Sequence, residues 1–142
     1  MRTVSSCLVG GLVAIAGFAT TYASTIACDF PKPWSRLKPV THPTLPGALL
    51  TKPTKITVGE PFSINVRICA PPTTGNFDRW TIEATMPAHR HGMNYRPVVQ
   101  RRDSEEIEAT GLVFHMPGHW QIDLAAYRGD EPMRWALDVH VK

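Results

Sequence analysis

The clearest structural signal in this chain lies in residues 119–141, HWQIDLAAYRGDEPMRWALDVHV. Apolar and polar side chains alternate over 119–127 and again over 133–141, and a Gly-Asp-Glu-Pro turn at 129–132 separates the two runs. A period of two is typical of a strand with one face on a core, so the stretch predicts a β-hairpin. Its core face would comprise Trp120, Ile122, Leu124, Ala126, Met133, Trp135, Leu137, Val139 and Val141.

The same alternation recurs upstream. It is clear at 62–69 and 79–86, and shorter runs follow at 93–101, 105–110 and 112–116. Turn residues separate these runs at regular intervals. Residues 54–142 are therefore expected to form an all-β domain, an immunoglobulin-like antiparallel β-sandwich of about seven strands, with a small barrel as the alternative.

Composition excludes several classes of protein. The chain has 142 residues, of which 43% are hydrophobic and 19% charged, which fits one globular domain. A net charge of +3 without a basic run gives no sign of nucleic-acid binding, and 13 prolines argue against a helix bundle. No nucleophile elbow, HExxH motif, phosphate loop or paired-carboxylate motif is present, so we do not expect an enzyme.

The N-terminus predicts export. Residues 1–23 contain Arg2, an apolar stretch at 8–19 and small residues near Ala23, which is the pattern of a signal peptide cleaved there or as late as residue 27. We expect a periplasmic or secreted protein that is at most peripheral to a membrane. Ile26-Ala27-Cys28 also resembles the end of a lipobox, so a lipid anchor on Cys28 is the alternative.

Residues 24–53 are expected to form a proline-rich leader. Seven prolines in and just after this segment exclude a helix and would interrupt a central strand. They lie at positions 31, 33, 39, 43, 46, 53 and 61. Apolar residues such as Trp34 and Leu49 predict that this extended leader lies against the domain.

Two cysteines, Cys28 and Cys69, remain after removal of Cys7 with the signal peptide. Two cysteines in an exported protein favour a disulfide, which here would join the leader to the first long strand. A thiolate metal ligand is the competing interpretation. Lipidation of Cys28 would exclude the bridge.

Histidine and methionine gather in residues 86–119, which contain four of the six histidines and three of the four methionines other than Met1. A mixture of imidazole and thioether donors suits copper. In an extended segment His89, His91 and Met93 would lie on one face, whereas a turn at Pro87 and Gly92 would bring Met86 towards Met93. The candidate ligands are His89, His91 and Met93, with Met86, His115 and His119 as additions.

A purely structural interpretation stands beside the copper site. Strand parity places Met86 and Met116 with core residues, and it places His115 and His119 on the opposite, solvated side. In that case the two histidine segments only shape turns.

Three motifs resemble the YtkA-like or FixH-like family of small exported bacterial domains. They are GEPF at 59–62, the MP pair at 86–87 with its histidines, and GHWQI at 118–122, within a resemblance that covers roughly residues 50–142. The resemblance implies an immunoglobulin-like sandwich outside the cytoplasmic membrane, and some relatives are associated with copper handling and haem-copper oxidase assembly. Met86, Pro87, His89 or His91, Gly118 and Trp120 match the family's motifs.

Two features depart from that family. FixH-type proteins keep an N-terminal membrane helix, whereas this segment looks cleavable, and His89-Arg90-His91 with Met93 is richer in ligands than the usual motif. The resulting prediction is a non-catalytic copper-binding protein whose partner is a copper donor or acceptor. The alternative is a non-metal accessory or interaction domain of a membrane or redox complex.

Overall fold

The structure is a computed structural model that describes residues 28–40, 45–71, 76–103 and 105–142. Within these ranges the chain contains ten strands and no helix, and the predicted signal peptide lies outside them. None of the described residues therefore belongs to a helix with the length and apolar character that a membrane crossing requires. The strands are β1 (Ser35–Arg36), β2 (Lys38–Pro39), β3 (Gly47–Lys52), β4 (Pro61–Ile68), β5 (Arg79–Met86), β6 (His91–Gly92), β7 (Val98–Arg101), β8 (Glu106–Val113), β9 (Gly118–Arg128) and β10 (Glu131–Val141).

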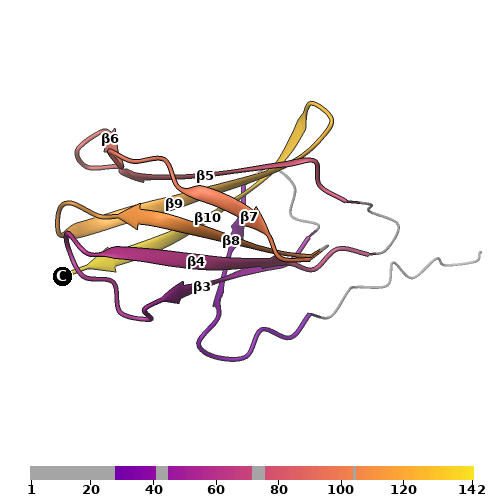
Figure 1. The fold of residues 1–142 in the computed structure, drawn as a ribbon, viewed down its shortest axis with the longest axis horizontal. Coiled ribbons are helices and arrows are strands. Elements are labelled where there is room, and N and C mark those ends of the chain that lie inside the picture. Colours follow the sequence, from indigo (N-terminus) through magenta and orange to yellow (C-terminus); the bar gives the residue numbers. More distant parts are fainter. Residues whose placement is uncertain (1–27, 41–44, 72–75, 104) are drawn as a thin grey trace, which may run out of the picture.

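The strands form two antiparallel sheets (Figure 1). Their neighbour orders are β1-β3-β4-β8-β7 and β2-β10-β9-β5-β6. An immunoglobulin domain has strands A, B, E and D in one sheet and C, F and G in the other. If β3 is taken as A, the first sheet reads A-B-E-D and the second reads G-F-C with β6 beside C. The predicted immunoglobulin-like sandwich is confirmed, and the barrel alternative is wrong because the strands divide between two sheets.

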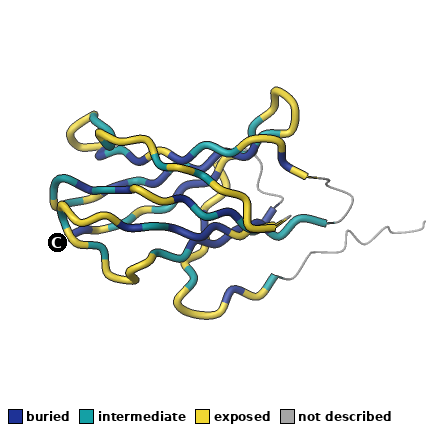
Figure 2. The backbone as a smooth tube through the Cα atoms, in the orientation of Figure 1, coloured by how far each residue is buried: buried dark blue, intermediate teal, exposed yellow. Residues whose placement is uncertain are grey.

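The core lies between the sheets, where the inward-facing side chains are buried (Figure 2). Phe114 stacks on Trp120 with ring centroids 4.5 Å apart, and Phe62 lies 4.8 Å from Phe114. The indole nitrogen of Trp135 donates a hydrogen bond to the Leu45 carbonyl at 3.0 Å. Burial of each such side chain stabilises the fold by roughly 1.5–3 kcal/mol, so these rings contribute a large share of the hydrophobic stabilisation of the domain.

The C-terminal hairpin has the predicted alternation. Arg128 pairs with Glu131 around the turn, and Gly129 has a φ of 60°, which a tight hairpin turn favours. Trp120, Trp135 and Val141 on the expected core face are buried, whereas Met133, Leu137 and Val139 are half-buried against the same core.

The three shorter runs differ from expectation. The runs at 105–110 and 112–116 are one strand, β8, whose ladder with β4 shifts register where Phe62 pairs with Leu112 and Ile64 with Ala109. Gly111, with a φ of 81°, lies in this bulge and lets the strand bend without ending. The run at 93–101 forms a strand only at β7, because residues 93–97 cross from the second sheet to the first.

The segment expected as a leader pairs with both sheets. Between Pro46 and Pro53 it is free of proline, and there β3 pairs with β4 over six residues and buries Ala48 and Leu49. Upstream, β1 pairs with β3 and β2 pairs with β10. The leader therefore contributes a core strand in addition to lying against the domain.

Cys28 and Cys69 form the predicted disulfide, with their Cα atoms 6.2 Å apart. The bridge ties the start of the described chain to the residue that follows β4. A sulfur in this bridge is available neither to a metal nor to a lipid.

Candidate metal site

A tight turn places the first histidine segment at one end of the sandwich (left in Figure 1). After β5 ends at Met86, the amides of His89 and Arg90 both donate to the Met86 carbonyl, at 3.1 and 2.9 Å. Pro87 fixes φ at the start of this turn, and Arg90 takes a positive φ of 56° at its end. The chain then reverses, so His91 in β6 pairs with Met86. Of the two predicted geometries the structure has the turn, and it brings His91, not Met93, opposite Met86.

The second histidine segment connects β8 to β9 at the same end of the sandwich. The indole nitrogen of Trp120 donates to the Met116 carbonyl at 3.0 Å, which holds the connection against the core. Gly118 has a φ of 127°, and a Cβ there would lie 2.9 Å from Cε of Met86. Glycine therefore permits the two segments to approach closely.

Three histidines meet where these segments approach, and we call His89, His91 and His115 the imidazole cluster. Ring centroids are 5.8 Å apart for His89 and His91, and 5.1 Å apart for His91 and His115. His89 is exposed, whereas His91 and His115 are half-buried. Both of these inner rings lie edge-on to Trp120, at 6.0 and 5.4 Å.

The ring separations in the imidazole cluster suit a shared metal ion. A metal bound about 2 Å from an imidazole nitrogen lies about 3 Å from the ring centroid, so two rings on one ion are about 4.5 to 6 Å apart. Nδ1 of His115 is buried and has no hydrogen-bond partner among the described residues. Such an atom costs roughly 1–3 kcal/mol unless a ligand satisfies it.

The cluster is not a complete three-ligand site. Within the described ranges no group of three or more His, Cys, Asp or Glu side chains is arranged to hold a metal ion. The two histidines that can hold an ion together are His91 and His115. His89 lies beside this pair and is exposed.

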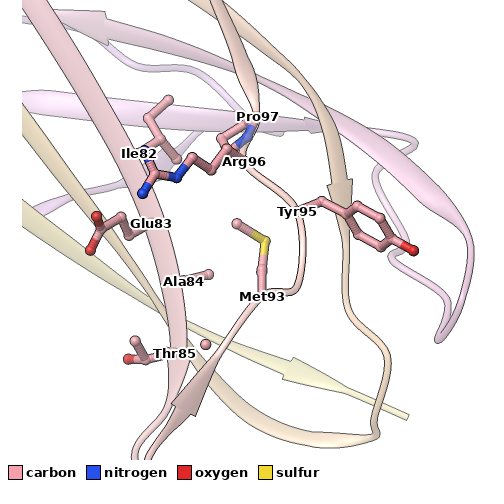
Figure 3. A pocket seen from close by; sticks show the side chains of 9 residues that line it. Ile82, Glu83, Ala84, Thr85, Met93, Tyr95, Arg96 and Pro97 are labelled. Atoms are coloured by element: carbon pink, nitrogen blue, oxygen red, sulfur yellow. The ribbon is translucent and has the colours of Figure 1, made fainter.

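The two predicted thioether ligands lie in different places. Met86 is 2% exposed and packs in the core beneath the cluster, next to Gly118. Met93 lines a separate pocket of about 190 Å³ between β5 and residues 95–97, as Figure 3 shows. The Met93 amide donates to the Ala84 carbonyl, which places Met93 two residues along β5 from the position opposite His91. The structure thus does not bring Met93 into the cluster.

His119 lies on the other face of its sheet from the cluster. It alternates with buried Trp120 along β9, and its Nε2 contacts Oδ1 of Asp138 at 2.9 Å. Asp138 also accepts from Lys38 at 2.8 Å, and these two hydrogen bonds lower the pKa of its carboxyl. His140, which the sequence analysis did not select, pairs directly with His119. The hairpin turn at 129–130 is the signal that could have predicted this pairing.

Comparison with known proteins adds no identification. No family model, curated protein or solved structure matches this chain. The resemblance to YtkA-like and FixH-like domains therefore stays a prediction from three short motifs.

Proposed function

We propose that this chain is an exported, non-catalytic protein that binds copper through His91 and His115. The observation on which the proposal depends is the pairing of these two rings, 5.1 Å apart, with a buried Nδ1 of His115 that no described residue satisfies. His89 is the additional donor, since its ring lies 5.8 Å from His91 and its side chain is exposed.

The donor chemistry favours copper over other metals. Imidazole is a ligand of copper and zinc, whereas calcium and magnesium prefer oxygen donors. Met86 is the direct partner of His91 in the β5–β6 ladder, so a soft thioether side chain lies on the neighbouring strand, which favours Cu(I). When bound, copper would be held by these rings and would exchange by ligand replacement.

The position of the cluster suits transfer to and from another protein. The cluster lies between two turns at the end of the sandwich, and its rings range from exposed His89 to half-buried His115. A partner that donates or accepts copper can reach His89 first, and the inner pair then retains the ion.

An anaerobic Cu(I) competition titration of the purified protein against a chromogenic chelator tests this proposal. We expect one site in the wild type, and at least tenfold weaker competition in His91→Ala and in His115→Ala. Gln121→Ala is the control, because Gln121 alternates with buried Trp120 and Ile122 and so lies on the opposite face of the sheet, and it should compete like the wild type. Equal competition by all four proteins would exclude copper binding at this pair.

That outcome would favour the second function, a non-metal interaction domain. Tyr95 and Val98 are 63% and 59% exposed and lie in and next to the crossover from β6 to β7, so they would then be the first contact residues to substitute.

A further inference from the structure

A second pair of histidines lies on the outer face of the second sheet. His119 in β9 and His140 in β10 are direct partners in the hairpin ladder. Both are exposed, and both alternate with core residues, Trp120 and Val141. Their side chains therefore point to the same solvated face.

The ladder makes this a close pair. The carbonyl of Arg134 in β10 accepts from the Val40 amide at 2.8 Å, on the side of β10 next to β2. The backbone N–H and C=O of Arg134 therefore point away from β9. His140 lies six residues further along β10 and has the same parity, which makes His119 and His140 a non-hydrogen-bonded pair. The Cβ atoms of such a pair are about 4.5 to 5.5 Å apart, and two imidazoles at that separation can reach one ion.

Asp138 determines which nitrogen of His119 is available. Oδ2 of Asp138 accepts from Nζ of Lys38, and Oδ1 accepts from Nε2 of His119 across 2.9 Å, because a carboxylate oxygen is an acceptor. Nδ1 is therefore the nitrogen of His119 that can face a metal ion. A carboxylate that orients a histidine in this way is the usual support of a metal ligand.

We propose that His119 and His140 form a second metal site that binds a borderline divalent cation, with Zn²⁺ as the probe. The pair supplies two imidazole nitrogens, and Asp138 positions one of them. Two imidazole nitrogens disfavour hard cations such as Ca²⁺ and Mg²⁺, which prefer oxygen ligands. The remaining coordination positions stay open to water or to a ligand of a partner. This site shares no ligand with the imidazole cluster, so it does not depend on the copper proposal.

Isothermal titration of the purified protein with Zn²⁺ measures the site. We expect His119→Ala and His140→Ala each to weaken Zn²⁺ binding at this site by at least tenfold, and Asp138→Asn to weaken it about tenfold. The control is the double variant His91→Ala/His115→Ala, which removes any Zn²⁺ bound by the imidazole cluster and should leave this site intact. All five side chains are at least partly exposed, and a single cooperative thermal transition in each variant would show that it folds.

Imidazole ¹⁵N spectra separate a ligand from a structural histidine. On addition of Zn²⁺, Nδ1 of His119 should shift while Nε2 keeps its proton in the wild type, and in Asp138→Asn the two tautomers of His119 should mix. The proposal is overturned if the spectra of His119 and His140 do not change with Zn²⁺, or if the Zn²⁺ titration is the same in wild type and His140→Ala.

Discussion

Gly118 controls how closely the two histidine segments approach. Its φ of 127° lies in a region that L-residues rarely adopt, and a Cβ would meet Cε of Met86 at 2.9 Å. The methyl is the end of a flexible side chain and can move, so backbone strain is the larger effect.

Substitution Gly118→Ala should therefore destabilise the protein by about 1–3 kcal/mol and weaken Cu(I) binding. Gly59→Ala is the matched control, because Gly59 also has a positive φ, 79°, but nothing within 4 Å of its Cβ position. Urea denaturation and the chelator competition measure the two effects. Loss of Cu(I) affinity in Gly59→Ala as large as in Gly118→Ala would contradict the role given to this close approach.

Two carboxylates on the outer face of the second sheet should respond to pH in opposite directions. Burial raises the pKa of Asp123, and the neighbouring Glu83 raises it further. Folding therefore disfavours the ionised form of Asp123, and this penalty is lost as pH falls through the raised pKa. For Asp138, hydrogen bonds from Lys38 and His119 lower the pKa, so its stabilisation is present at neutral pH and lost as pH falls through the lowered value.

Asp123→Asn should thus raise the thermal midpoint at pH 7. The corresponding gain in unfolding free energy should be less than about 1 kcal/mol and should shrink as the pH falls. Asp138→Asn should lower the midpoint at pH 7 and have no effect at the acid end. Thermal scans from pH 7 to pH 3 measure both. If the two substitutions shift the midpoint in the same direction at pH 7, the assigned causes are wrong.

The disulfide joins the leader to the strand that centres the first sheet. Its cysteines are 41 residues apart, and closing a loop of that length stabilises a protein by about 3 to 4 kcal/mol in the chain-entropy model. In a Cys7→Ser background, reduction should lower the free energy of unfolding in urea by this amount and shift the urea midpoint to a lower concentration. The Cys28→Ser/Cys69→Ser double variant should have the low midpoint with or without reductant, and a midpoint that reduction does not move would contradict the bridge's contribution.

Strands with a clear period of two were predictable from the sequence, and irregular ones were not. β4, β5, β9 and β10 follow directly from alternation, whereas β3 lies between prolines that argued against a central strand. Pairing with β4 and burial of Leu49 outweigh the weak local signal there. The runs at 105–110 and 112–116 were expected to be separate, but Gly111 bends β8 inside a continuous ladder.

The candidate site was predictable only as a set of residue types. The sequence indicated His89, His91 and His115 as candidate ligands in two separate segments, but only the pairing of β5 with β6 and β9 brings those segments together. Met93 was expected on one face with His89 and His91, but the chain after the turn runs back along β5 and brings Met93 to Ala84. Strand alternation turns His119 outward, where it contacts Asp138. His140 was missed although the hairpin turn fixes its partner.

In the molecule as a whole, one end of the sandwich holds both proposed sites on different surfaces. The turns that follow β5 and β8 lie at the same end of the sandwich (Figure 1), and the imidazole cluster lies between them. The His119–His140 pair lies on the outer face of β9 and β10. Core residues such as Trp120 and Val141 separate the two surfaces, so binding at one site should leave the other unchanged.

The most direct test of copper binding by His91 and His115 is anomalous diffraction at the copper edge from crystals of the protein loaded anaerobically with Cu(I). We predict a peak about 2 Å from a ring nitrogen of His91 and from Nδ1 of His115, with His89 rotated towards it. A map with no peak at this pair, with copper only at Met93 or only on the outer sheet face, would contradict the account.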